Sequence, residues 1–367
     1  MKIAYCIREN WKSTLGGDVV QMLQTKAEIE KKYDVEIQIM ETYQELKKFQ
    51  PDIVHIFNMQ TLEESSKYLS EAKELGCITV LSTIYWDLSH ARFIINFAKF
   101  GIFCKDEGFR NLYHLYNHSE SFISKIIGKP TSATNKYKNK VKNFLKEFDI
   151  FLPNSEEEMQ IINRVFNESF TNYCVIPNSV DFNKFPFRQN KHRKGFITAA
   201  RIEPIKNQLI VAKIAQEYKY DLTLVGGFSS NNENYVNKLK NISKNKIELI
   251  TNNVSQDVLR DLFLQHKVHV LASFRESPGL SSLEAIGSGL NLVVSESKYC
   301  PTETYFKDLI NKYVFLCDPY SSKSIHKAMK KANDMQNPDS NLINQFTWYN
   351  TAEYTYQSYL KALGSKV

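Results

Sequence analysis

The chain has 367 residues, of which 43% are hydrophobic and 13% aromatic, and its formal net charge is +7. This composition excludes an intrinsically disordered protein, and the length suits two domains that each bury a core. No apolar run reaches the roughly 18 residues of a transmembrane helix, and the N-terminal apolar run is too short for a signal peptide. Six scattered cysteines without a CxxC pair indicate a reducing compartment. We therefore expect a cytoplasmic protein.

Short apolar, β-branched runs alternate with helical patterns along the whole chain. In the first half they predict strands at Ile3–Ile7, Val35–Met40, Ile53–Phe57, Ile78–Leu81 and Ile150–Pro153. In the second half they predict strands at Phe196–Ala199, Leu222–Val225, Ile247–Ile250, Val268–Ala272, Leu292–Ser295 and Val314–Cys317. This alternation is typical of parallel sheets covered on both faces, and about eleven strands exceed one ordinary sheet. We predict an α/β protein with two Rossmann-like, doubly wound domains, linked by the turn cluster at Val175–Asp181.

In such sheets, ligands bind beyond the carboxyl ends of the strands, and two facing domains place the site in the cleft between them. Gly16, Gly17 and Asp18 end the loop after the first strand. The glycines allow either close backbone approach to a ligand or a tight strand-to-helix connection. The chain has no G-x-G-x-x-G fingerprint, Walker loop, H-E-x-x-H or D-x-D motif. We therefore expect no metal and no cofactor.

Arg201 and Lys206 follow the strand at Phe196–Ala199, in "TAARIEPIKNQ". They are either a solvated pair of charges or an anion site. Cations at a helix N-terminus oppose the helix dipole unless they hold an anion. An arginine fork with a lysine point charge suits a diphosphate.

The stretch "RESPGLSSLEAIGSG" (Arg275–Gly289) carries two carboxylates, Glu276 and Glu284, around a Pro-Gly break. One interpretation is a capping box with Ser281 as N-cap and Glu284 at the third helical position. A glycosidase acid/base pair fits poorly, because such carboxylates usually come from separate elements. The third interpretation is a phosphate site, in which the helix start exposes backbone N–H groups and the carboxylates bind flanking hydroxyls.

Taken together, these motifs resemble the family-4 retaining glycosyltransferases, which have the GT-B fold and an E-x7-E signature. "RESPGLSSLEAIGSGLNLVVSE" is similar to that signature, and "LGGD" to the family's glycine-rich loop. "PDIVHIFN", "VIPNSVDFNKF", "ARIEPIKNQ", "LVGG" and "FTWYNTAEYTYQSYL" match further family segments in the same order. The resemblance implies an N-terminal acceptor-side domain at 1–176, a nucleotide-sugar-binding domain at 177–345 and a helix at 346–367 that returns to the first domain.

Carried over to this sequence, the resemblance implies a nucleotide-sugar co-substrate bound mainly by the second domain, and of the nucleotides we expect a UDP-sugar. Arg201 and Lys206 would hold the diphosphate, and Glu276 the sugar hydroxyls. Glu284 would bind the ribose, and Asn253 and Val254 would lie near the base. The remaining donor-binding positions would be Gly16, Gly17, Ser277, Gly279, Leu280 and Ser281. The chemistry would retain anomeric configuration and need no protein nucleophile.

The acceptor side is implied by position rather than by a full motif. Asp18 would lie near the acceptor, and Trp86 would form an apolar wall for a sugar. Relatives often place a histidine after the fourth strand, where this chain has Tyr85, Trp86 and Asp87. His90 is the candidate substitute, although a lone histidine is commonly a core or surface residue.

The segment Arg92–Glu147 contains eleven Lys and Arg residues and four acids. Its excess of seven positive charges equals the net charge of the whole chain. It is also rich in aromatic residues. This pattern indicates either a helical insertion with a solvated basic face or attachment to an anionic membrane surface, which would suit a lipid-linked acceptor. Nucleic-acid binding is disfavoured because no binding motif accompanies the charge.

We therefore expect a glycosyltransferase that serves a glycan, glycolipid or glycoprotein acceptor in cell-surface polysaccharide or glycoconjugate synthesis, at the inner face of the membrane. The alternative is a non-catalytic, transferase-like subunit that binds an acceptor or a partner protein.

Overall fold

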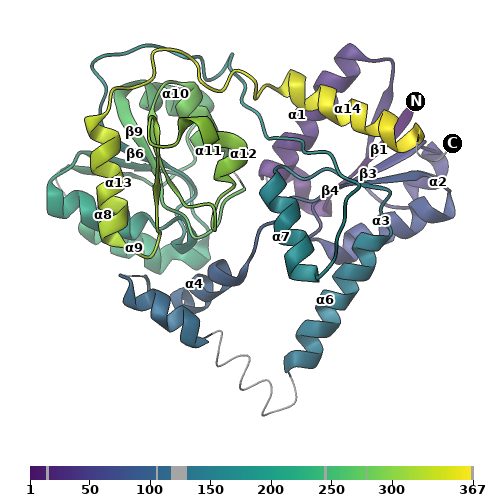
Figure 1. Cartoon of the computed structure of the whole chain (residues 1–367), viewed down its shortest axis with the longest axis horizontal. Coiled ribbons are helices and arrows are strands. Elements are labelled where there is room, and N and C mark those ends of the chain that lie inside the picture. Colours follow the sequence, from purple (N-terminus) through teal and green to yellow (C-terminus); the bar gives the residue numbers. More distant parts are fainter. Residues whose placement is uncertain (14–15, 105, 117–129, 244–245, 278, 365–367) are drawn as a thin grey trace. The chain divides into compact units, whose positions relative to one another are not determined.

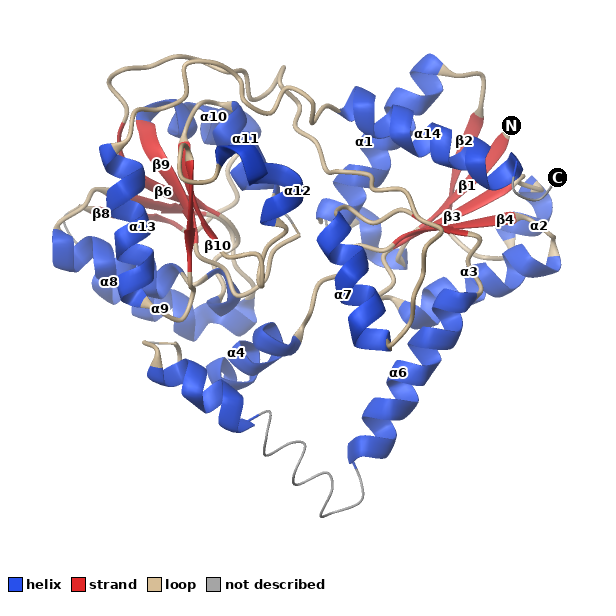
Figure 2. Ribbon diagram, viewed as in Figure 1, coloured by secondary structure: helices blue, strands red, loops and turns tan. Residues whose placement is uncertain are grey.

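The computed structural model describes residues 1–13, 16–104, 106–116, 130–243, 246–277 and 279–364, without the side chains of 130–135. The chain forms two compact units (Figure 1). The first unit contains Met1–Trp86, Ser124–Ser179 and Gln345–Val367, and the second contains Asp87–Ile123 and Val180–Asn344. Each unit is built on one parallel sheet with helices around it (Figure 2).

The sheet of the first unit has five parallel strands in the order β2-β1-β3-β4-β5. The strands are β1 Lys2–Cys6, β2 Glu36–Met40, β3 Ile53–Phe57, β4 Ile78–Ser82 and β5 Ile150–Phe151. Successive residues of β1 enter different cores: Ala4 and Cys6 pack in one cluster, and Ile3 and Tyr5 pack in the other. Because adjacent side chains of a strand point to opposite faces, both faces of this sheet are covered.

The helices of the first unit divide between these two cores. One core holds residues of α2 (Glu45–Phe49), α3 (Leu62–Glu74), α6 (Pro130–Lys146) and α7 (Glu156–Phe166). The other core holds residues of α1 (Gly17–Lys32) and α14 (Trp348–Gly364), and a short 3-10 turn, Glu9–Lys12, precedes α1. The C-terminal helix α14 is anchored by a buried hydrogen bond of 2.6 Å between the Tyr359 hydroxyl and His55 Nδ1.

The sheet of the second unit has six parallel strands in the order β11-β10-β9-β6-β7-β8. They are β6 Lys194–Ala199, β7 Leu222–Val225, β8 Ile247–Ile250, β9 His266–Leu271, β10 Asn291–Ser295 and β11 Val314–Cys317. All of the predicted strands are therefore present close to their predicted bounds. The prediction of two doubly wound α/β sheets is confirmed.

Helices follow most strands of the second unit. They are α8 Gln208–Tyr218, α9 Glu233–Ile242, α10 Gln256–Gln265, α11 Leu280–Gly287, α12 Thr302–Phe306 and α13 Ser322–Asp334. Short 3-10 turns lie at Pro204–Lys206, Ser230–Asn232 and Lys307–Leu309. None of the helices in the described ranges is long and apolar enough to cross a bilayer.

The basic segment is divided differently from the sequence expectation, which assigned all of 92–147 to the first domain. Helix α4 (Ser89–Lys99) and helical residues 108–116 belong to the second unit, whereas α6 belongs to the first. The reason is packing: Phe93, Phe103, Phe109 and Tyr113 are buried in the same cluster as the core residues of the second sheet. We call residues 89–116 the aromatic hairpin.

Candidate functional site

The predicted donor-binding residues follow neighbouring strands of the second sheet. Arg201 and Lys206 come after β6, Asn253 and Val254 come after β8, and the stretch that starts at Glu276 comes after β9. Strands β9, β6, β7 and β8 are adjacent and parallel. Because the carboxyl ends of parallel strands lie at one edge of a sheet, these loops share that edge.

Lys206 and Glu276 form a largely buried ion pair. Lys206 Nζ lies 2.6 Å from Glu276 Oε1, and the two side chains are 16% and 8% exposed. The Ser273 hydroxyl donates to the same carboxylate oxygen at 2.7 Å. A lysine amine has three donors, and Glu276 is its one acceptor among the described residues. The remaining donors are available for an anionic ligand.

The start of helix α11 differs from the capping-box interpretation, which is wrong. The N-cap is Gly279 at φ +85°, not Ser281, and Ser281 lies inside the first turn without making a cap. A glycine is required here because the left-handed region disfavours other residues, and an added Cβ would lie 3.0 Å from Leu271 Cδ2. Among the described residues, no acceptor is bonded to the backbone N–H groups of Leu280 and Ser281, as expected of a first helical turn. Such a turn is an anion site.

Glu284 lies in the body of α11 and makes no capping bond. No described residue donates a hydrogen bond to its carboxylate, although it is surrounded by protein and only partly accessible. Desolvation raises the pKa of Glu284 to about 7, and the charge of Lys184 only partly opposes this shift. An unpartnered carboxylate at this depth is suited to accept hydrogen bonds from ligand hydroxyls.

Three further predicted residues lie in the loops after β8 and β9. The Ser277 hydroxyl oxygen is buried and has no hydrogen-bond partner among the residues that the structure describes. The amide of Asn253 lies against Gly227, where an added Cβ would be 2.3 Å from Asn253 Oδ1, and Val254 is half-buried. The close approach of these loops explains the second glycine of "LVGG", a role that the sequence did not predict.

Arg201 is not joined to this cluster. Its side chain is 77% exposed and pairs with Glu203 Oε1 at 3.2 Å. Within the described parts of the chain it makes no ion pair with Glu276, so the structure brings together Lys206, Glu276 and the start of α11 but not Arg201.

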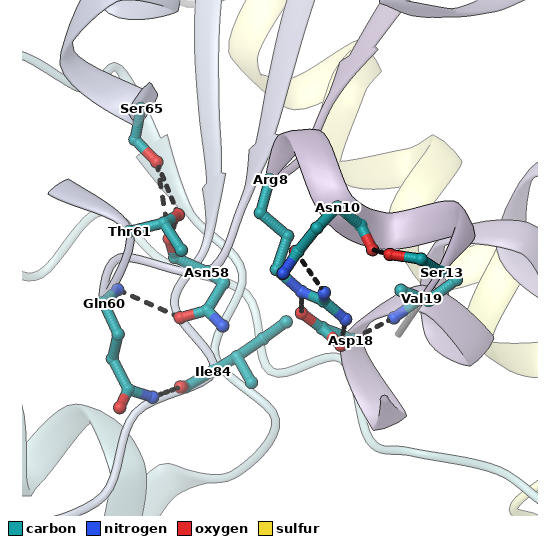
Figure 3. Close-up of polar contacts among 10 residues, drawn as sticks. All are labelled: Arg8, Asn10, Ser13, Asp18, Val19, Asn58, Gln60, Thr61, Ser65 and Ile84. Atoms are coloured by element: carbon teal, nitrogen blue, oxygen red, sulfur yellow. Dashed lines mark hydrogen bonds and ion pairs between the residues drawn. The ribbon is translucent and has the colours of Figure 1, made fainter. Parts of the chain in front are cut away.

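The glycine-rich loop lies at the carboxyl edge of the first sheet. Gly16 is the N-cap of α1, Gly17 begins the helix, and an added Cβ at Gly16 would lie 2.5 Å from Asp18 Oδ1. Asp18 is 9% exposed and accepts a hydrogen bond of 2.9 Å from Arg8 Nε (Figure 3). Arg8 was not predicted from the sequence, where its only signal is its position directly after the first strand.

The loops after β3 and β4 hold two residues with unusual backbone conformations. Asn58 has φ +77° and Ile84 has φ +46°, the latter an outlier for a β-branched residue. Gln60 connects them: its backbone N–H donates to Asn58 Oδ1 at 2.9 Å, and its amide donates to the Ile84 carbonyl at 2.8 Å (Figure 3). Strain of this kind concentrates at functional sites, and sequence patterns gave no sign of it.

The remaining acceptor-side candidates occupy other places. Trp86 is 1% exposed in the core of the first unit, so its ring offers no face to a sugar. Asp87 accepts a hydrogen bond of 2.9 Å from the Ser89 N–H, a local turn contact. His90 is 5% exposed and lies in the second unit, stacked on Tyr113 at 3.9 Å between ring centroids. It therefore lies outside the first unit, to which its position in the sequence had assigned it.

These features define a GT-B-like fold, with two parallel α/β units and a lysine, a glutamate pair and a helix N-terminus at the carboxyl edge of the second sheet. Among the described residues, no three His, Cys, Asp or Glu side chains gather as a metal site. Residues 179–347 match the model of the family described as "Glycosyl transferases group 1". The match places the second unit in this family, the retaining glycosyltransferases of family 4, whose members are in general metal-independent.

Solved structures agree with this fold. Sucrose-phosphate synthase from Thermosynechococcus elongatus is similar with a TM-score of 0.68 at 11% identity, over 100% of both chains. A glycosyltransferase from Rickettsia africae ESF-5 gives 0.67 at 12% identity, over 99% of this chain and 98% of that one. An E. coli structure described as trehalose-6-phosphate bound with UDP-2-fluoro glucose gives a TM-score of 0.57 at 10% identity, over 98% of this chain and 96% of that one. No curated protein sequence matches the chain.

Proposed function

We propose that the chain transfers a sugar from a nucleotide-diphosphate sugar, a UDP-sugar in the first instance, to a glycan, glycolipid or glycoprotein acceptor of the cell surface. The observation that supports this most is the Lys206–Glu276 pair beside the start of α11, together with the Glu284 carboxylate in the same helix, which no described residue bonds.

The chemical roles follow from charge. In the reaction the bond between the anomeric carbon and the diphosphate breaks, and negative charge grows on the leaving group. Lys206 and the free N–H groups of Leu280 and Ser281 stabilise that charge, which is the main task of a transferase without a protein nucleophile. Glu276, oriented by Lys206 and Ser273, accepts hydrogen bonds from the sugar hydroxyls.

The other donor contacts are assigned by position. Glu284 binds the ribose hydroxyls, and Asn253 and Val254 lie near the base. Arg201 must leave Glu203 to reach the diphosphate, which its exposed side chain allows. The acceptor oxygen attacks on the face that the diphosphate leaves, and its proton passes to the leaving phosphate.

A thermal-shift panel of UDP-, GDP-, ADP- and CMP-sugars tests the proposal, because a ligand that binds only the native state raises Tm by mass action. Lys206→Met should abolish the Tm shift given by the best donor, while Lys246→Met, at an exposed lysine of the same unit, should retain it. If no nucleotide sugar binds or is hydrolysed, with or without membrane lipids, the enzyme proposal fails and the non-catalytic alternative stands.

Attachment to an anionic membrane has support of its own. The five consecutive residues 136–140 of α6 are all exposed and include Lys136, Lys138 and Lys140. Three cations near an anionic surface contribute about 1 kcal/mol each. Flotation with vesicles of phosphatidylcholine and phosphatidylglycerol should fall with salt and with reversal of these charges to glutamate. Equal binding to pure phosphatidylcholine vesicles would contradict this attachment.

A further inference from the structure

Three polar contacts join the aromatic hairpin to one loop of the second unit, the segment after β11. The Ser321 hydroxyl donates to Glu107 Oε1 at 2.6 Å, and Arg110 forms an ion pair with Asp318. His90 Nδ1 and the Tyr320 hydroxyl share a hydrogen bond of 3.0 Å. The hairpin is thus fixed to a loop at the same sheet edge as the donor-binding residues.

Tyr320 and Tyr299 connect the hairpin to the backbone that carries Lys206 and Glu276. The Tyr320 ring packs edge-on against Phe274 at 4.7 Å, and the Phe274 N–H donates to the carbonyl of Ile205, the neighbour of Lys206, at 2.9 Å. The His90 ring packs edge-on against Tyr299 at 5.0 Å.

The second contact reaches Glu276 itself. The Tyr299 carbonyl accepts the Glu276 N–H at 2.8 Å, so the backbone of Glu276 is held by a residue that His90 contacts. The backbone of Glu276 is thus connected to His90 through Tyr299 alone, and the backbone beside Lys206 is connected to it through Phe274 and Tyr320.

We propose that His90 is a positioning residue for the donor site, and that the aromatic hairpin sets the place of the Lys206–Glu276 pair through Tyr320 and Tyr299. His90 is 5% exposed and does not reach a ligand itself. Burial, aided by the charge of Lys298, lowers the pKa of His90 to about 4. The ring is therefore neutral at pH 7, and its hydrogen bond to Tyr320 does not depend on pH near neutrality. This inference rests on the proposed donor site.

Removing the hydrogen bond from either side tests it. His90→Phe keeps a ring stacked on Tyr113 and loses the bond, and Tyr320→Phe loses the same bond. We expect each variant to raise the donor KM by about three- to tenfold, the range given by one net hydrogen bond, with kcat and the acceptor KM little changed. The double variant should have the same donor KM as either single variant. His90→Asn should have a donor KM between those of His90→Phe and the wild type.

Lys238→Met is the matched control. Lys238 holds the far end of the hairpin, with Nζ 2.9 Å from the Gly101 carbonyl and 4.5 Å from the Phe103 ring centroid. In the described part of the chain Lys238 has no polar or ring contact with Tyr299 or Tyr320, so its loss should lower Tm without changing the donor KM.

Hydrogen exchange gives a readout that needs no donor. His90→Phe should speed exchange of the Glu276 amide, and Lys238→Met should not. If His90→Phe lowers Tm but leaves both this exchange and the donor KM as in the wild type, the inference is refuted and His90 is merely a core residue. If the exchange changes but no nucleotide sugar binds the wild type, the proposed function fails and the positioning of Glu276 stands.

Discussion

Replacing Glu284 by glutamine should stabilise the protein without ligand and weaken its binding of nucleotides. Desolvation raises the pKa of this carboxyl from about 4.5 in the unfolded chain to about 7 in the folded protein. Between these pH values the native state keeps a proton that the unfolded chain releases. The free energy of unfolding therefore falls as pH rises through this window and is constant above it.

The size of the effect follows from the shift. At about 1.4 kcal/mol per pKa unit, the shift from 4.5 to about 7 gives an upper limit of about 3.5 kcal/mol. Glu284 remains partly accessible, so solvent reduces this penalty, and we expect a gain of about 1–2 kcal/mol for Glu284→Gln at pH 8. For a domain of this size the change corresponds to a rise in Tm of roughly 2–6 °C.

The assay is thermal unfolding at pH 5 and pH 8, with nucleotide affinity measured by calorimetry. Glu284→Gln should match the wild type at pH 5, exceed it at pH 8 and bind the nucleotide more weakly. The wild type should bind nucleotide more tightly from pH 6 to 8, because the ionised carboxylate is the better acceptor, and the variant should lack this trend. Glu233→Gln, at an exposed glutamate of α9, is the control. A loss of Tm at both pH values with unchanged nucleotide affinity would refute the reasoning.

Three other substitutions give distinct results. Gly279→Ala should lower the free energy of unfolding by about 1–2 kcal/mol, because the φ of this residue is +85°, and should weaken nucleotide binding. Urea unfolding measures the first effect and calorimetry the second. Gly226→Ala should cost more than about 2 kcal/mol in the same urea assay, since its Cβ would lie 2.1 Å from the Ala200 carbonyl oxygen. Tyr359→Phe leaves the buried His55 Nδ1 unpaired and should cost about 1–3 kcal/mol without changing nucleotide affinity, and a change in that affinity would contradict its purely structural role.

The strands were predictable because a parallel strand that is buried on both faces has a continuous run of apolar residues in its sequence. Ile53–Phe57 is buried along its whole length and was located to the residue. The hairpin was not assignable in the same way. Its amphipathic pattern shows that one face is buried, but the pattern does not state which of two sheets buries it. That choice depends on contacts such as Phe103 with Tyr235, more than a hundred residues further along the chain.

The residues of the candidate site were proposed from the sequence, but their geometry could not be predicted from it. The spacing of Ser281 and Glu284 matches a capping box, yet Gly279 at positive φ starts the helix earlier and leaves Glu284 half-buried, without a hydrogen-bond partner among the described residues. The pair of Lys206 with Glu276 joins residues that are 70 positions apart. Local patterns carry no information at that separation. The strained Asn58 and Ile84 were missed because strain is a property of the backbone in its folded context.

The path of the chain between the two units also bears on how the protein folds during synthesis. The aromatic hairpin leaves the ribosome before residues 180–344, which form the sheet that it covers. Phe93, Phe103 and Phe109 therefore lack their packing partners until residues 180–344 have been synthesised. The first unit likewise stays incomplete until its last helix, α14, arrives. A fragment that stops near residue 179 would be an aggregation-prone intermediate for a chaperone, and exchange of domains between relatives must move the hairpin together with the second sheet.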